Sequence, residues 1–548
     1  MSSDPACARR PPQPLRALDP AGFHRPRACA LQPLPQQGPG WTGRSWPCRP
    51  RRPRPSWRQM VSSRTRYPIQ PTSDALRCPM SATDPSTDHP LRQALTQALR
   101  ARDPAQAVPA AEALVRAFPQ SALAWSGLAD ALTLSGQVGI AVDARRQAVA
   151  FKPRDGTLQF NLGTALLAAS DPAGAVVVLQ AASQHLPRTP RLLMNLGVAL
   201  RELGRLSEAA DALARAARNA PANTPLAANI TWNQSLVHLM GGDLRAGLPA
   251  YESRRKLPRF SLRVPRHLPS WDGQSRPQKL LIVAEQGLGD TFQYARWIRR
   301  VESCAETLVV AVQKPLVALL RAGLDRACER TEIIPLDRNL AVSKVDAWAP
   351  LLSLPWLLNA VQRGSHVEST PWLAADPTLV DHWRTRLARE PGPVRVGIVW
   401  QGNPHYLGDC HRSVPLEVFA PIARLPGVTL VSLQKRHGRR QLTRLPEGMH
   451  VADLHKELDE TTGPFLDTAA AMQVLDLVIT SDTATLHLAG ALGVRTLAAI
   501  AHIPDWRFGL TGNHLPEYPH VRLVRQPRPG DWTSVADVMA RWIHKHMC

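Results

Sequence analysis

The sequence lacks several features that mark common classes of protein. No stretch approaches the ~20 consecutive apolar residues of a membrane-spanning helix. We therefore expect no transmembrane segment, which leaves peripheral contact with a membrane open. Four of the eight cysteines lie beyond residue 79, and they show no spacing typical of metal ligands. A reduced, cytoplasmic setting without a bound metal is the expectation.

Charge is distributed unevenly along the 548 residues. The formal net charge is +22 and the isoelectric point about 10.7, values typical of nucleic-acid-binding proteins. Half of the excess, however, lies in residues 1–79, which hold fourteen Arg, no Lys and three Asp. No motif that interleaves aromatic and basic residues appears, so we expect no nucleic-acid partner.

Residues 1–79 are rich in Pro and Arg, as in "RPRRPRPSWR" at 49–58, and have no hydrophobic periodicity. Such a segment buries too little apolar surface to offset its chain entropy, and it lacks the apolar core of a signal peptide. It is either a basic disordered arm or the product of a start assigned too far upstream. We favour the second interpretation, with Met80 as the true start.

A repeat of 34 residues dominates the region 87–256. Three segments, 123–154, 157–188 and 191–222, align with anchors at the same positions. The anchors are Leu128, Leu162 and Leu196, then Ala141, Ala175 and Ala209, then Pro153, Pro187 and Pro221. This period and pattern are those of tetratricopeptide repeats, which stack helical hairpins into a solenoid. A degenerate repeat before it and a divergent one at 223–255 predict four or five units that bind a protein or peptide, or serve as a dimerisation or spacer module.

A Pro-rich connector at 257–277 precedes a first α/β half at 278–390. "KLLIVAE" predicts a buried strand, and "TFQYARWIRRV" predicts a helix. Between them, "QGLGD" places Gly287 and Gly289 at a strand-to-helix turn, where a ligand can approach the backbone. Asp290 opens the helix, so its role is either that of a helix cap or that of a general base at the carboxyl edge of the sheet.

A second α/β half is expected at 394–545. "VRVGIVW" and "DLVITSD" predict core strands, and "SDTATLH" joins the latter to a helix, where backbone N–H groups suit a diphosphate. Two sequential Rossmann-like halves that face each other across a cleft form the GT-B layout of many nucleotide-sugar transferases. The predicted fold class is thus an α-solenoid of tetratricopeptide repeats followed by an α/β GT-B fold.

The chain resembles bacterial tetratricopeptide proteins with a C-terminal glycosyltransferase family 9 domain, the domain of ADP-heptose:lipopolysaccharide heptosyltransferases. The resemblance spans residues from about 90 to 545, nearly everything after Met80. The motifs that carry it are "AEQGLGDTFQYARW" (284–297), "PLLSLP" (350–355), "GIVWQGNP" (397–404), "RSVPLEVFAPI" (412–422), "VSLQK" (431–435), "SDTATLHLAGALG" (481–493), "PDWRF" (504–508) and "LVRQPRPGDW" (523–532).

The resemblance implies roles for individual residues. Asp290 matches the catalytic base that deprotonates the acceptor hydroxyl. The donor diphosphate is assigned to Arg412, Ser413, Lys435, Asp482, Thr483, Ala484 and His487, and the cleft backbone to Gly287, Gly289, Gly402 and Asn403. No Asp-x-Asp motif occurs in the α/β region, so we expect neither a metal nor another cofactor, with the nucleotide sugar as a substrate.

Two departures from the family concern the substrates. The loop "GNPHYLGDCHRS" lacks the Thr pair and the Lys that heptosyltransferases usually carry, which leaves the donor sugar open. Those enzymes also lack a solenoid, which favours a protein or protein-bound acceptor here. The competing hypothesis is a non-catalytic adaptor in which the solenoid recruits partners and the transferase domain is degenerate.

Overall fold

The computed structural model describes residues 84–548 except 261, 263, 265, 266, 325–327, 338–343, 361–370 and 407. The predicted tail, 1–79, lies outside the described residues. In the described part of the chain, no helix combines the length and the apolarity that crossing a membrane requires.

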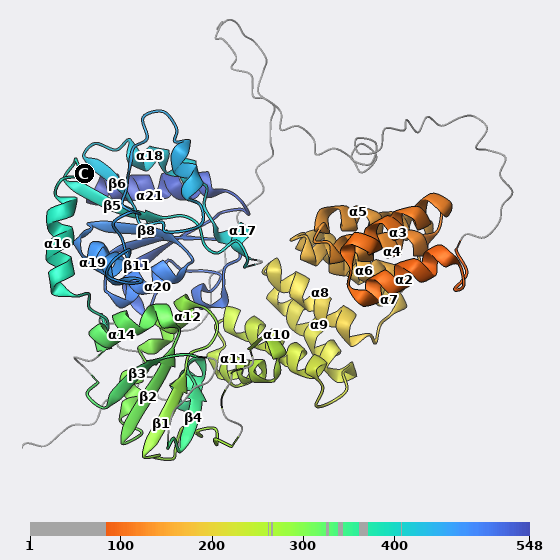
Figure 1. Cartoon of the computed structure of the whole chain (residues 1–548), viewed down its shortest axis with the longest axis horizontal. Helices are drawn as coiled ribbons and strands as arrows, with labels where there is room; N and C mark the ends of the chain where they lie inside the picture. Colours follow the sequence, from red (N-terminus) through yellow and green to blue (C-terminus); the bar gives the residue numbers. More distant parts are fainter. Residues whose placement is uncertain are drawn as a thin grey trace, which may run out of the picture. The chain divides into compact units, whose positions relative to one another are not determined.

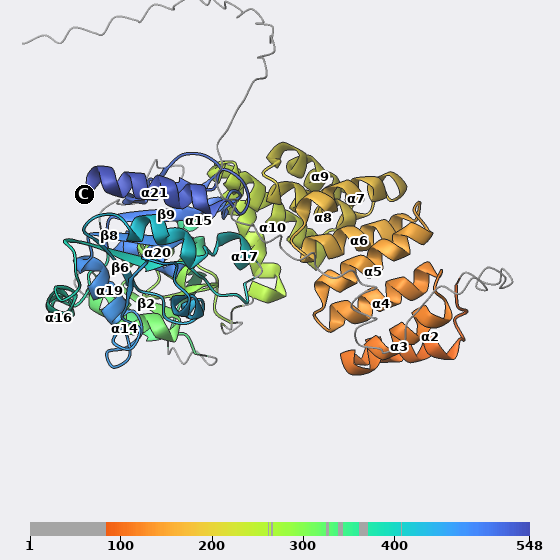
Figure 2. The same ribbon diagram turned by 90° about the horizontal axis from the view of Figure 1, so that it is seen from above.

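Antiparallel helical hairpins form the N-terminal part and stack side by side (Figures 1 and 2). In chain order they are α2 (Pro90–Ala101) with α3 (Pro104–Ala117), α4 (Ala122–Leu134) with α5 (Val138–Phe151), α6 (Gly156–Ala168) with α7 (Pro172–His185), α8 (Pro190–Glu202) with α9 (Leu206–Asn219), and α10 (Pro225–Met240) with α11 (Leu244–Tyr251). This confirms the tetratricopeptide solenoid.

The 34-residue anchors explain how each hairpin closes. Ala175 and Ala209 are completely buried where the paired helices cross. A side chain at Gly163 would collide with Leu179, and one at Gly197 would collide with Leu213. The small residues therefore let the helices approach closely, as the repeat pattern predicts.

The first α/β half contains a parallel sheet of order β3-β2-β1-β4. Its strands are β1 (Lys279–Val283), β2 (Thr307–Val312), β3 (Thr331–Pro335) and β4 (Ala347–Pro350). Its helices are α12 (Leu288–Ala295), α13 (Ile298–Glu302), α14 (Val317–Leu324) and α15 (Leu354–Leu357), whereas α16 (Pro377–Leu387) packs against α19 (Leu466–Val474) of the second half. The alternation of strand and helix makes this half an α/β unit.

The second half contains a sheet of order β10-β11-β9-β8-β5-β6-β7, parallel except for the β10–β11 pair. Its strands are β5 (Val394–Val399), β6 (Val428–Ser432), β7 (Val451–Asp453), β8 (Leu477–Ser481), β9 (Thr496–Ile500), β10 (His514–Leu515) and β11 (Tyr518–Arg525). Its helices are α17 (Asp409–Arg412), α18 (Ala420–Ala423), α19 (Leu466–Val474), α20 (Ala484–Ala491) and α21 (Trp532–His546). This half is also α/β.

The solenoid does not end in a separate core. Leu248 and Tyr251 of α11 are buried in the same hydrophobic cluster as Leu280 of β1 and Ala489 of α20. In the connector, Trp271 is buried, and its backbone N–H donates to Trp348 O at 2.7 Å. The predicted boundaries at 256 and 278 therefore lie within one packed region.

Candidate active site

The predicted turn at the end of β1 forms as a tight strand-to-helix joint. Gly287 is the N-cap of α12, and Asp290 is the third residue of the helix. The Asp290 carboxylate accepts a hydrogen bond from Gly287 N at 2.9 Å. Asp290 thus caps the turn, which fulfils one of its two predicted roles without excluding the other.

The second oxygen of Asp290 forms an ion pair with Arg507, in the short helix η8 (Trp506–Phe508) that follows β9. Arg507 also donates to Asp505 at 2.8 Å, and its side chain is only 9% exposed. Burial alone would lower the pKa of Arg507, but the Asp505 and Asp290 carboxylates raise it well above its ordinary value. A cation from the second half is therefore fixed on the predicted base of the first half.

The predicted diphosphate joint meets the same turn. A side chain at Gly289 would lie 3.2 Å from Ala484 Cα and 3.1 Å from His487 Cδ2, so the N-termini of α12 and α20 are in direct contact. The absence of a side chain at Gly289 thus lets the two helices come close together, whether or not a ligand also binds there. Thr483 is the N-cap of α20, but its side chain makes no capping hydrogen bond.

Uncapped amides and a partly buried carboxyl group lie at the start of α20. Among the described residues, the N–H groups of Ala484 and Thr485 have no hydrogen-bond acceptor. Burial, together with the charge of Asp505, raises the pKa of Asp482 to about 7. Arg412 and Arg507 oppose this shift by attraction. A positive helix end flanked by two arginines is suited to an anion.

His487 occupies the interior of this arrangement. Its Nδ1 lies 3.3 Å from the hydroxyl of Tyr518, and its ring stacks on Phe508. Burial and the nearby arginines lower its pKa well below the ordinary value, so it is neutral near pH 7. The side chain of His487 thus contacts a tyrosine on β11.

The loop after β5 places Arg412 and Ser413 on a buried aspartate. Arg412 Nε donates to Asp409 Oδ1 at 3.2 Å, and Ser413 Oγ donates to Asp409 Oδ2 at 2.8 Å. Gly402 N donates in turn to Ser413 Oγ at 3.1 Å. The Asn403 carboxamide accepts from His405 N and closes a local turn. Asp409 therefore organises this loop.

Lys435 is directed elsewhere. Its ammonium group donates to the carbonyl oxygens of His455, at 2.9 Å, and Leu458, and pairs with Glu460 at 2.6 Å. All three of its protons are thus used by the loop at 455–460. In the described conformation Lys435 fastens this loop, and no donor remains for a ligand.

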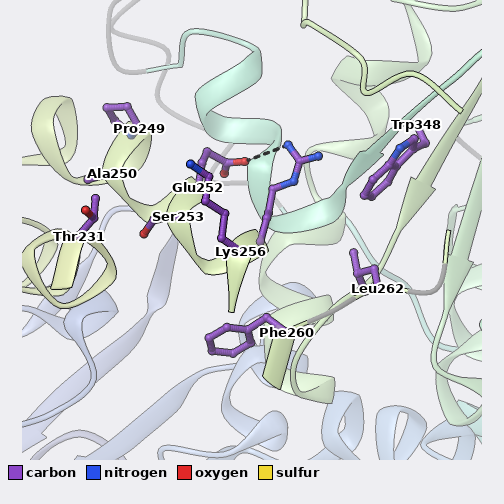
Figure 3. A pocket seen from close by; sticks show the side chains of 10 residues that line it. Thr231, Pro249, Ala250, Glu252, Ser253, Lys256, Phe260, Leu262 and Trp348 are labelled. Atoms are coloured by element: carbon purple, nitrogen blue, oxygen red, sulfur yellow. Dashed lines mark ion pairs between the residues drawn. The ribbon is translucent and has the colours of Figure 1, made fainter. Parts of the chain in front are cut away.

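Two cavities lie near these elements. One of about 490 Å³ is lined by Ser413, Asp409, Tyr406 and neighbouring residues of the loop after β5. The other, of about 680 Å³, lies where α10, α11 and the short helix η2 (Glu252–Lys256) meet Trp348 of β4 (Figure 3). Ser413 lines the first of these two cavities, and Asp290 and His487 line neither.

The residue that sequence reasoning missed is Arg507. The motif "PDWRF" contributed to the family resemblance, but it gave no role to the arginine. The available signal was the sequence Asp505-Trp506-Arg507 in the loop that follows a buried strand, because strand ends at this edge converge on the site.

Comparisons with known proteins support the repeats. A family model described as tetratricopeptide repeat matches residues 94–156 and 160–224. Protein FlbA of Caulobacter vibrioides is 27% identical over 433 residues, which are 74% of this chain and 70% of FlbA. The N-terminal part is thus a tetratricopeptide solenoid, and the C-terminal part is an α/β region with mostly parallel sheets.

Among solved structures, similar chains include MamA from Desulfovibrio magneticus RS-1, at 18% identity and a TM-score of 0.29, covering 31% of this chain and 93% of MamA. YrrB, described as a tetratricopeptide protein with an unusual peptide-binding site, is 18% identical with a TM-score of 0.27, covering 30% and 82%. PilW, a type IV pilus biogenesis factor, is 20% identical with a TM-score of 0.28, covering 30% and 75%.

Proposed function

We propose that this chain is a glycosyltransferase that moves a sugar from a nucleoside-diphosphate donor to a hydroxyl acceptor. One observation carries the proposal. Asp290 of the first half and the uncapped start of α20 in the second half lie at one place, joined by the Arg507 ion pair and the Gly289–Ala484 contact. A base and an anion site on opposite halves are the two parts that such a reaction needs.

The reaction divides between the halves. Asp290 takes the proton of the acceptor hydroxyl. As it does so, the acceptor oxygen forms a bond to the anomeric carbon of the donor sugar, and the bond from that carbon to the diphosphate oxygen breaks. The electron pair leaves with the diphosphate, which the amides of Ala484 and Thr485 and the Arg412 guanidinium would hold. With Asp482 near its pKa of about 7, protonation of this group would reduce repulsion of the diphosphate.

Arg507 would control when Asp290 can act. In the described structure one carboxylate oxygen is engaged by Gly287 N and the other by Arg507. The acceptor proton can reach the carboxylate once Arg507 shifts its contact towards Asp505, which it already binds. The ion pair would then keep Asp290 oriented in the resting enzyme and release it on substrate binding.

The tetratricopeptide repeats indicate a role in protein interaction. In the proposed enzyme they recruit the acceptor, or a partner that carries it. The non-catalytic adaptor is the alternative, and it predicts that the residues around Asp290 serve only the fold.

The substitution Asp290→Asn separates these possibilities. Asparagine keeps the size of the side chain and its acceptor for Gly287 N, but it does not take up a proton. Loss of a general base typically slows a reaction about 10²–10⁴-fold. We expect transfer to fall at least about a hundredfold, while a nucleoside diphosphate still raises the melting temperature as in the wild type.

The readout is nucleoside-diphosphate release from a panel of ADP-, UDP- and GDP-sugars, with and without EDTA, alongside thermal shift. Asp211→Asn on the exposed face of α9 is a matched control for loss of one carboxylate. Turnover of Asp290→Asn within about threefold of the wild type would remove Asp290 as the base. A wild type that neither binds nor turns over any donor would favour the adaptor.

A further inference from the structure

A completely buried arginine joins the end of the solenoid to the strand that carries the site. Arg254, in η2, is 0% exposed. Its guanidinium donates to Glu285 at 2.6 and 3.2 Å, to Glu252 at 2.6 Å and to Ser353 at 2.8 Å. Glu285 lies directly before the "QGLGD" turn, so the arginine fastens the entrance of that turn.

Stability alone does not account for this network. Removing two or three charges from water costs several kcal/mol per ion, and well-packed apolar side chains often replace such networks without loss. A buried bidentate pair instead fixes orientation, because the planar guanidinium group holds the carboxylate in one geometry. Of this network, Glu252 lines the cavity shown in Figure 3.

Tyr251 of α11 contacts both sides of the site. Its hydroxyl accepts a hydrogen bond from Gln286 Nε2 at 3.0 Å. Gln286 has a left-handed backbone, with φ +62°, a conformation that is unfavourable for a non-glycine residue and persists only where the surrounding structure holds it. The ring of Tyr251 packs against Trp506, the neighbour of Arg507, with centroids 6.1 Å apart.

The solenoid reaches the same loop at a second point. A side chain at Gly204, between α8 and α9, would lie 2.9 Å from Ile503, which precedes η8. Helix α10 also packs directly against η8. The two groups of the Asp290–Arg507 ion pair are thus each supported by the repeats, one through Glu285 and Gln286 and the other through Trp506.

We propose that Arg254 and Tyr251 are positioning residues for the proposed transfer reaction, and that the last repeat sets the geometry of Asp290 against Arg507. The inference rests on the proposed function for its kinetic consequence. Its structural part, that the repeat holds the turn at 285–290, is independent of any activity.

Two conservative substitutions test the proposal in the full chain. Arg254→Lys keeps the positive charge but loses the bidentate hydrogen bonds of the guanidinium group to Glu285. Tyr251→Phe keeps the aromatic ring and loses only the hydrogen bond to Gln286. We expect faster amide hydrogen exchange at 285–290 in both variants. Turnover of the donor panel should fall about tenfold or more with an unchanged KM for the donor, since a misplacement of ~1 Å can cost about 10² in rate.

Arg145→Lys is the matched control. Inside the solenoid, Arg145 forms an ion pair with Asp130 at 2.5 Å and donates a hydrogen bond to Ser126 Oγ at 2.6 Å; its side chain is 10% exposed, and that of Asp130 is 49% exposed. We expect it to leave exchange at 285–290 and donor turnover as in the wild type. If Arg254→Lys does not fold, Tyr251→Phe decides.

The outcomes are distinct. Wild-type exchange at 285–290 in folded Tyr251→Phe and Arg254→Lys would overturn the inference. So would equal loss of turnover in Arg145→Lys. Faster exchange at 285–290 with no turnover of any donor by the wild type would uphold the positioning role and reject the glycosyltransferase.

Discussion

Five charged side chains share the volume between the two halves: Asp290, Asp482, Asp505, Arg412 and Arg507. Asp409, which pairs with Arg412 at 3.2 Å, adds a fourth carboxyl group, so carboxyl groups outnumber the two guanidinium groups. The excess is relieved at Asp482, whose pKa rises to about 7. Burial is the largest cause of this shift, and partial protonation of Asp482 near pH 7 reduces the excess of negative charge.

This balance makes stability dependent on pH. From the ordinary value of 3.8 to about 7, the folded chain holds the Asp482 proton that the unfolded chain has released. Stability therefore falls as the pH rises through this window. We expect Asp482→Asn to melt higher relative to the wild type at pH 8 than at pH 5, as measured by calorimetry. The exposed Asp211→Asn should show no such trend, and a difference independent of pH in Asp482→Asn would contradict the assignment.

At this scale the sequence predicts some residues and misses others for a physical reason. Asp290, Thr483 and the start of α20 follow from local patterns, a buried strand, small residues and then a helix. Arg507 does not, because its partner Asp290 is 217 positions away. The hydrogen bond between Tyr251 and Gln286 joins the last repeat to the turn after β1. Hydrophobic periodicity predicts each of these segments but not a contact between them.

At the scale of elements, the contact between α12 and α20 links the halves. It depends on Gly289, whose backbone has an ordinary conformation, so an alanine there would be strained only by its neighbours. The strand-and-helix alternation predicted both helices. The contact between their N-termini could not be predicted, because the same motifs would suit a cleft in which the two ends stand apart.

A glycine comparison tests this contact. Alanine in place of glycine within an exposed helix typically stabilises by about 0.5–1 kcal/mol. At Gly139 of α5 nothing lies within 4 Å of the added carbon, so Gly139→Ala should gain that amount. Gly289→Ala should gain nothing or lose stability, because its carbon would press on Ala484 and His487. Equal gains in urea unfolding at both positions would show that the helix ends can separate freely.

At the scale of the whole described chain, the repeats and the α/β region share a core. Leu248 and Tyr251 pack with residues of β1, and Arg254 neutralises the buried Glu285. The sequence correctly predicts a tetratricopeptide solenoid and an α/β region, and it places a connector between them. The sequence does not reveal that the last hairpin packs both in the solenoid and in the core of the α/β region. An apolar helix face has the same sequence pattern whether another repeat or a sheet covers it.

Truncation should expose this dependence. A chain that begins at Gln278 would bury Glu285 without its arginine, and breaking a buried pair costs about 3–5 kcal/mol. A chain that begins at Pro190 retains α8 to α11 and the whole Arg254 network. We expect the longer chain to melt cooperatively by circular dichroism and the shorter one not to. Cooperative melting of both would mean that the α/β region folds by itself.

The shared last hairpin also bears on how such a protein can evolve. Solenoids lengthen and shorten by duplication or loss of whole units, and each unit needs only its neighbours. Here the units that touch the site loops through Gly204, Tyr251 and Arg254 lie at the C-terminal end of the array. New repeats can therefore be added at the N-terminal end without disturbing these contacts, whereas exchange of the final hairpin between relatives requires matching changes at Glu285, Gln286 and Trp506.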